Sequence, residues 1–228
     1  MTRLPLVILR PEPGASETEA RAQALGLTTI KLPLFKVAAE AWEALPASTF
    51  DALLLTSANA ARLGGAGLVA YAELPCLAVG EATAAAARKA GIDPVWVGPD
   101  NGASALAEAA VRGWTRLLWL CGVQHSPLAH PGINIRIMPV YSAHAVESAN
   151  AARAAAFAHP AIILLHSQRA AWALADMAID RQRFGLNAIS AGVAAVAGEG
   201  WAWVHWPELP RDQDMLELAA TLCQKAPL

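Results

Sequence analysis

Small hydroxyl side chains and glycines gather where apolar runs of this sequence end. Thr56 and Ser57 follow the run 52–55, and Ser167 follows the run 161–165. Backbone N–H groups at strand-to-helix loops, aided by helix N-termini, bind carboxylates or phosphates without many Arg or Lys side chains. We therefore predict an anion-binding site in these loops. The candidate substrate-binding residues are Arg10, Thr56, Ser57, Asn59, Gly80, Thr83, Gly122, Ser167, Gln168 and Ser190.

These residues also have a simpler alternative role. Ser and Thr are favoured helix N-caps because their side-chain oxygen accepts a hydrogen bond from the first turn. Arg10, at the end of the first apolar run, could pair with an anion or lie solvated in a loop. Thr83, in the turn Gly80-Glu81-Ala82-Thr83, is the hydroxyl residue for which we favour a functional role.

Tyr141 is the candidate for proton donation. It is one of only two tyrosines, the other being Tyr71. A phenol has a pKa of about 10, so it stays protonated at neutral pH and can donate a proton or a hydrogen bond. The alternative for Tyr141 is packing at a junction between domains.

The sequence lacks the motifs of several common types of functional site. The six His residues are scattered, with no H-x-x-x-H and no Cys pair nearby, so we expect no metal. No G-x-S-x-G elbow is present, and the adjacency of His166 and Ser167 in sequence does not create a base–nucleophile contact. The glycine cluster 64–67 does not follow a strand and no Walker motif exists, so a dinucleotide or nucleotide site is not expected.

Composition limits the class of protein. With 228 residues, 55% hydrophobic and 16% charged, the chain can build a substantial core in one large domain or two small ones. A net charge of −2 argues against a nucleic-acid partner. The three cysteines are far apart and odd in number, which fits a reducing cytosol. No signal peptide or spanning helix is visible, so we expect a cytoplasmic chain without a membrane partner.

Short apolar runs alternate with Ala-rich segments throughout the chain. This alternation predicts an α/β fold with parallel sheets and helices on both faces. In such sheets ligands bind at the carboxyl ends of the strands, where the candidate residues lie. We also expect Ser16 and Ser104 to cap helices and Glu40–Leu45 to form a helical turn.

An internal repeat supports two similar halves. Ser57 and Ser167 are 110 positions apart. An ungapped shift that holds over some fifty residues suggests two copies of one αβ unit. The other matched pairs at this offset include Leu54 and Leu164, Ala60 and Ala170, Ala61 and Ala171, Ala78 and Ala188, Leu106 and Leu216, Ala109 and Ala219, and Ala110 and Ala220.

The repeat leaves two ways to divide the chain. A simple duplication places the boundary near residue 113. However, the segments 32–36 and 137–142 also look alike, since each has a Pro two residues before an aromatic residue. They could be paired strands that carry the chain out of one domain and back.

The ordered motifs of the chain resemble those of the uroporphyrinogen-III synthase family, and the resemblance runs nearly end to end. No single motif decides it, but their order and spacing together are fairly specific. The motifs are Leu9-Arg10-Pro11, Pro33-Leu34-Phe35, Phe50-Asp51-Ala52, Leu55-Thr56-Ser57-Ala58-Asn59-Ala60, Ala78-Val79-Gly80-Glu81-Ala82-Thr83-Ala84, Gly98, Leu106-Ala107 and Pro139-Val140-Tyr141.

The resemblance implies a bilobed fold of two α/β domains joined by a two-stranded connection. One domain would comprise residues 1–35 and 144–228, and the other residues 38–140, with linker strands at 35–38 and 140–144. This division agrees with the paired strands and replaces a boundary near 113.

The resemblance also implies a function. The reaction would be the cofactor-free cyclisation of the linear tetrapyrrole hydroxymethylbilane, with loss of water and inversion of ring D, by a hydro-lyase that we expect to be a monomer. The family's motif tyrosine, here Tyr141, would help the hydroxyl leave, and its motif threonine, here Thr83, would lie near the substrate.

The chain departs from the family pattern in its second half. Where a hydroxyl residue often follows the glycine, this chain has Val193, and Ser190 is the nearby residue that could replace it. The loop 121–125 lacks the basic residues often seen there. The rival hypotheses are a non-catalytic bilobed binder of a small polyanion, and a regulatory or interaction domain that kept the fold.

Overall fold

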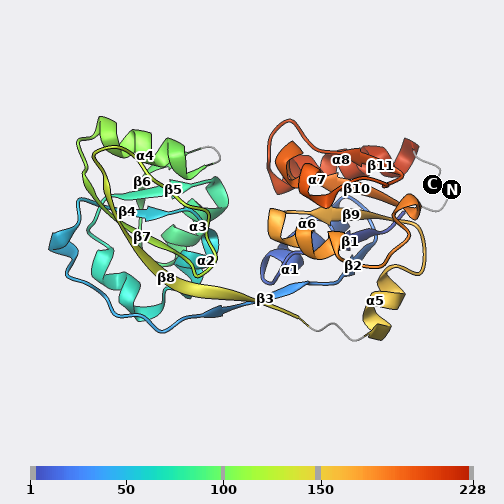
Figure 1. Ribbon diagram of the computed structural model, residues 1–228, viewed down its shortest axis with the longest axis horizontal. Helices are drawn as coiled ribbons and strands as arrows, with labels where there is room; N and C mark the ends of the chain where they lie inside the picture. The colour runs from blue at the N-terminus through green and yellow to red at the C-terminus, as the bar shows by residue number, and fades with distance from the viewer. Residues whose placement is uncertain (1–3, 99–100, 147–149, 226–228) are drawn as a thin grey trace. The chain divides into compact units, whose positions relative to one another are not determined.

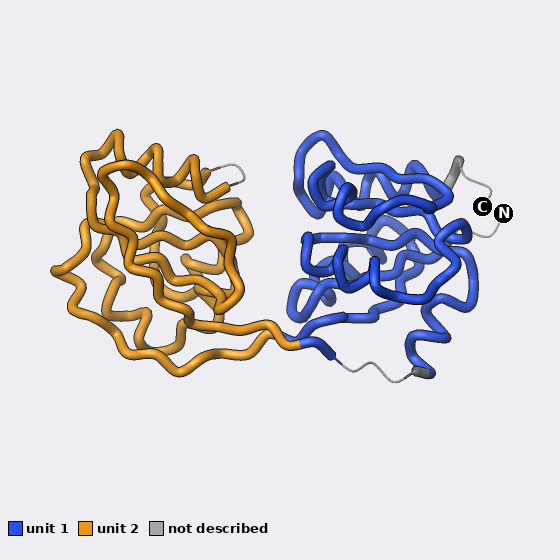
Figure 2. Tube along the Cα trace, in the orientation of Figure 1, with its two compact units in different colours: residues 1–36, 145–228 blue, residues 37–144 orange. Residues whose placement is uncertain are grey.

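The chain divides into two compact units. The computed structural model describes residues 4–98, 101–146 and 150–225. One unit comprises residues 1–36 and 145–228, and the other residues 37–144 (Figure 2). We call them unit 1 and unit 2. The chain therefore passes between the units twice, once in each direction.

Unit 1 is built on a five-stranded sheet with the order β11-β10-β9-β1-β2, in which all neighbours pair in parallel (Figure 1). Its strands are β1 Leu6–Ile8, β2 Thr29–Lys31, β9 Ala161–Leu165, β10 Phe184–Ala188 and β11 Trp203–His205. Its helices are α1 Gly14–Ala24, α5 Asn150–Ala156, α6 Gln168–Ala175, α7 Ala191–Ala197 and α8 Asp212–Lys225, with a 3-10 turn at Arg181–Arg183.

Helices cover both faces of the sheet of unit 1. Every residue of the apolar strand β9 is buried, as a central strand between two helical layers requires. On one face α5, α6 and α7 pack through small apolar residues such as Ala170 and Val193. On the other face α1 and α8 pack through residues such as Ala22 and Met215. Alternate residues of β9 enter the two cores, Ile163 the first and Ile162 the second.

Unit 2 contains a six-stranded sheet with the order β3-β8-β7-β4-β5-β6. Its strands are β3 Phe35–Ala39, β4 Ala52–Leu55, β5 Cys76–Val79, β6 Pro94–Gly98, β7 Arg116–Gly122 and β8 Asn134–Ala145. Its helices are α2 Ala58–Leu63, α3 Glu81–Lys89 and α4 Gly102–Val111, with 3-10 segments at Ala47–Thr49 and Gly65–Tyr71. Helices α2 and α3 cover one face and α4 the other.

The two units repeat one arrangement, as the 110-residue offset predicted. Helix α3 begins at Glu81 and α7 at Ala191, while α4 begins at Gly102 and α8 at Asp212. The matched strands β4 and β9 differ in one neighbour, because β4 lies beside β7, whereas β9 lies beside β1 from the start of the chain. The α/β fold with parallel sheets flanked by helices is therefore confirmed.

Three local predictions are wrong. Helix α1 begins at Gly14, and the backbone N–H and hydroxyl of Ser16 instead donate to the Glu12 carboxylate, at 3.0 and 2.9 Å. Helix α4 is capped by Asn101, whose side-chain oxygen accepts from the Ser104 N–H at 2.9 Å.

The third wrong prediction is a helical turn at Glu40–Leu45, where no helix forms. There the Leu45 N–H donates to the Tyr71 hydroxyl at 2.8 Å, a bond that ties this segment to the body of unit 2. Within the described residues, no helix combines the length and the apolar character that a bilayer crossing requires.

Candidate active site

Tyr141 lies over Gly122 at the carboxyl end of the sheet of unit 2. The two residues are paired in register between β7 and β8, and the Val123 N–H donates to the Tyr141 carbonyl at 2.8 Å. A Cβ atom built on Gly122 would lie 2.8 Å from Cζ of the Tyr141 ring and 3.1 Å from its hydroxyl oxygen. The absence of a side chain at Gly122 therefore allows the phenol to lie directly on the strand.

The Tyr141 phenol contacts the hydroxyl of Ser57. Ser57 caps α2, where its Oγ accepts from the Asn59 N–H at 3.2 Å. Burial raises the pKa of Tyr141, and the hydrogen bond with Ser57 offsets only part of this effect. The phenol is therefore protonated at neutral pH and can donate a proton. The structure thus brings together three predicted residues from three elements.

Thr56 contacts Trp119, whose indole N–H donates to the Thr56 hydroxyl at 3.0 Å. His125 packs edge-on against Trp119, with 5.0 Å between ring centroids, and its Nδ1 lies 2.9 Å from the Gly122 carbonyl oxygen. Because a carbonyl oxygen only accepts, His125 Nδ1 carries the proton in this contact. These contacts hold the loop after β7 against the sheet.

Gly80 and Thr83 form the start of α3. Gly80 has φ +81°, a conformation that favours glycine, and its N–H donates to the Gly98 carbonyl at 2.8 Å. Its own carbonyl accepts from the Thr83 N–H at 3.1 Å. The Thr83 side chain is only 4% exposed. Thr83 therefore lies inside unit 2 rather than on its surface.

In unit 1 the predicted residues also cap helices. Ser167 accepts from the Ala170 N–H at 3.2 Å, and Ser190 accepts from the Val193 N–H at 3.4 Å. A Cβ atom built on Gly192 would lie 3.9 Å from Gln168 Nε2 and 4.0 Å from Ser190 Oγ. The loops after β9 and β10 therefore place Gln168 beside the start of α7, while the side chain of Val193 is buried.

The family of the chain follows from its similarity to known proteins. A family model described as uroporphyrinogen-III synthase HemD matches residues 16–217. The chain belongs to the uroporphyrinogen-III synthase family. The resemblance found in the sequence motifs is therefore confirmed, and membership assigns the chain to tetrapyrrole biosynthesis.

Solved structures of uroporphyrinogen-III synthases share this fold. The structure described as the synthetase of Helicobacter pylori has a TM-score of 0.67 and 17% identity, covering 96% of this chain and 99% of that one. A mutant synthase of Thermus thermophilus has a TM-score of 0.52 and 19% identity, covering 97% and 100%. No curated protein sequence matches the chain.

Arg10 is one of the predicted substrate-binding residues. In this member of the uroporphyrinogen-III synthase family, it takes part in an ionic network within unit 1. Its guanidinium lies 3.4 Å from Asp212 Oδ1 and donates to Thr18 Oγ1 at 3.1 Å. Asp212 also accepts from Thr18 at 2.8 Å, from Arg21 at 2.7 Å and from His166 Nε2 at 2.7 Å. Arg10 is therefore already paired with a carboxylate of its own unit, that of Asp212.

Thr18, His166 and Asp212 were not among the predicted site residues. Burial lowers the pKa of His166, more than the neighbouring Asp212 carboxylate raises it. Burial alone would raise the pKa of Asp212, but the hydrogen bonds from His166, Thr18 and Arg21 hold it below its usual value. Asp212 is therefore a carboxylate and His166 a neutral ring at pH 7. Their one sequence signal was position, since Asp212 starts a helix and His166 directly follows a strand.

Two further observations bear on the chemistry of the chain. Burial raises the pKa of the Cys121 thiol to about 11, so Cys121 is a poor nucleophile at neutral pH. Within residues 4–98, 101–146 and 150–225, no group of three His, Cys, Asp or Glu residues could hold a metal ion.

Proposed function

We propose that the chain is a cofactor-free hydro-lyase that cyclises hydroxymethylbilane to uroporphyrinogen III with inversion of ring D. The observation that carries the proposal is the protonated Tyr141 phenol, held on Gly122 and beside Ser57 at the carboxyl ends of β4 and β7. Membership of the uroporphyrinogen-III synthase family supplies the reaction class. We further propose that the chain acts as a cytoplasmic monomer.

In the proposed reaction Tyr141 donates its proton to the substrate hydroxyl, which leaves as water. The remaining azafulvene cation closes on its own, and it gives the wrong isomer unless the chain of pyrroles is held. Inversion of ring D requires that the bond between this ring and its bridge to ring C breaks and re-forms at the other α-carbon of ring D. One proton is released on ring closure and returns to Tyr141, so the net change is the loss of one water. General acid catalysis contributes about 10²–10⁴-fold, and positioning of the reactive cation determines which constitutional isomer forms.

The proposed substrate contacts are loops rich in N–H and hydroxyl groups, which suit a polycarboxylate. Gln168 and Ser190 are supported as contacts because they lie near each other and neither side chain is buried. Thr83 is buried, so we propose that the start of α3 contributes backbone groups rather than this hydroxyl. The other proposed contacts are Arg10, Thr56, Ser57, Asn59, Gly80, Gly122 and Ser167.

The proposal is tested by the product isomer. Hydroxymethylbilane generated in situ closes spontaneously to isomer I, so chromatography of the oxidised products reports what the protein adds. We expect the purified chain to divert product to isomer III, whereas heat-denatured chain does not. Isomer I alone would reject the proposed function, and tight binding without turnover would favour the alternative of a non-catalytic polyanion binder.

Substitution Gly122→Ala tests the placement of the phenol. The new methyl group would overlap the Tyr141 ring, so the ring must shift from its place beside Ser57. We expect turnover to fall about tenfold or more, because small displacements of a reacting group are costly. Thermal unfolding should change little, since the displaced atoms are the far end of a side chain.

A double variant provides the control for this prediction. Gly122→Ala combined with Tyr141→Phe should be no slower than Tyr141→Phe alone, because both changes remove the same hydroxyl contact. Normal turnover in Gly122→Ala, or fully additive losses in the double variant, would contradict this role for Gly122.

A further inference from the structure

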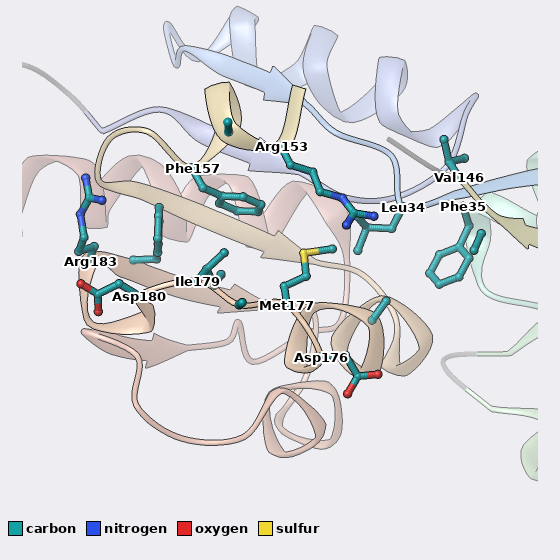
Figure 3. A pocket seen from close by; sticks show the side chains of 15 residues that line it. Leu34, Phe35, Val146, Arg153, Phe157, Asp176, Met177, Ile179, Asp180 and Arg183 are labelled. Atoms are coloured by element: carbon teal, nitrogen blue, oxygen red, sulfur yellow. The ribbon is translucent and has the colours of Figure 1, made fainter. Parts of the chain in front are cut away.

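Unit 1 contains a pocket that the proposed reaction does not use. Its volume is ≈ 680 Å³, within the size range of pockets that hold small organic ligands. Helix α5, the end of α6 and the segment leading into β10 surround it (Figure 3). Asp180, Arg183 and Phe184 line it at the amino end of β10, whereas Ser190 follows the carboxyl end. This end of the pocket is therefore remote along the strand from the proposed substrate loop.

The wall of the pocket combines apolar and aromatic side chains with four charged ones, Arg153, Asp176, Asp180 and Arg183. The Phe157 and Phe184 rings meet edge to face in its wall, with 5.5 Å between centroids and 81° between planes. Met177 and Ile179 complete the same surface. Aromatic edges and faces, together with an adaptable Met side chain, favour a flat apolar ligand.

Arg153 supplies a cationic group to this pocket. Its Nε is buried, and among the described residues this atom has no hydrogen-bond partner. Figure 3 shows the Arg153 side chain extending from α5 toward Leu34 and Met177, while Asp180 and Arg183 lie at the other end. By contrast, Arg183 donates to the Ala158 carbonyl at 2.8 Å. The Arg153 guanidinium carries further N–H groups besides Nε, and a carboxylate in the pocket would accept hydrogen bonds from them.

We propose that this pocket binds an amphipathic carboxylate, with the carboxylate on Arg153 and the apolar body against Phe157 and Phe184. A polycarboxylate does not suit the site, because Asp176 and Asp180 also line it and would repel further negative charges. The ligand therefore differs in class from the tetrapyrrole substrate. The proposal does not depend on the activity of the chain.

The test is calorimetric titration of the full chain with 2-naphthoate. We expect saturable binding, with clearly weaker binding of the uncharged 2-naphthalenemethanol. Arg153→Gln should weaken 2-naphthoate binding about tenfold or more, because a charge-assisted bidentate pair is lost. Ala173→Phe places a ring in the pocket and should abolish binding.

The control is Arg112→Gln in unit 2, which removes an arginine paired with Glu108 at 2.6 Å and should leave binding unchanged. Circular dichroism and thermal unfolding establish that each variant is folded. Absence of saturable binding to the parent chain would overturn the proposal. So would binding that survives both Arg153→Gln and Ala173→Phe, because the probe would then lie elsewhere.

Discussion

Substitution Tyr141→Phe is expected to lower turnover of hydroxymethylbilane about tenfold or more while the chain stays folded. Phe keeps the ring that lies over Gly122 and removes only the hydroxyl that meets Ser57. Because burial keeps the pKa of this phenol above its ordinary value, the parent side chain holds its proton at neutral pH. The loss should therefore appear in turnover rather than in unfolding, and initial rates and thermal melts measure the two separately.

Tyr71→Phe is the matched control, because Tyr71 is the other tyrosine and also lies in unit 2. Its hydroxyl donates to the Leu45 carbonyl at 3.0 Å and accepts from the Leu45 N–H at 2.8 Å. Removing it should cost about 1–3 kcal/mol of unfolding free energy, since two hydrogen bonds to the Leu45 backbone are lost at about 0.5–1.5 kcal/mol each. Turnover per folded molecule should be unchanged. Equal turnover in Tyr141→Phe and the parent chain would leave Tyr141 a structural residue.

Substitution Asp212→Ala is expected to destabilise unit 1 by up to about 3–5 kcal/mol, the cost of removing one partner from a buried ion pair, because the His166 side chain is buried while Arg10 and Arg21 are more exposed. The Asp212 side chain is 15% exposed and joins Arg10, Arg21 and His166. These groups come from α8, the loop after β1, helix α1 and the end of β9. Without the carboxylate, Arg10 and Arg21 face each other across the gap, and His166 loses its acceptor. Chemical denaturation at pH 7 measures the loss.

Asp214→Ala provides the comparison on the same helix. Asp214 pairs with Arg211, whose side chain is 65% exposed, and pairs of this kind contribute about 0–1 kcal/mol. We therefore expect a small change for Asp214→Ala and a large one for Asp212→Ala. Similar losses in the two variants would contradict the structural role given to the network.

The repeated architecture could be predicted because its signals are local. The apolar run 161–165 forms β9 with those bounds, and Ser57 and Ser167 cap the helices that follow their strands. The offset of 110 residues then allowed the strands and helices assigned in one half to be assigned in the other. The caps at Ser16 and Ser104 were misplaced because Glu12 and Asn101, a few residues earlier, supply the acceptors instead.

Long-range contacts in the candidate site could not be predicted. Asp212 meets Thr18 across 194 positions and His166 across 46, and no periodicity links such residues. For the same reason, the sequence predicted the position of Arg10 at a strand end but did not predict its ion pair with Asp212. The contact of Tyr141 with Gly122 also depends on the register between β7 and β8. A motif selected Tyr141 and its position at a strand end selected Gly122, but only the pairing of the strands brings the two together.

The most direct measurement is the isomer composition formed when hydroxymethylbilane is supplied in large molar excess over the purified chain. We predict that most of the product is uroporphyrinogen III, formed over many turnovers and without added cofactor or metal. Product consisting of isomer I at the spontaneous rate would contradict the account.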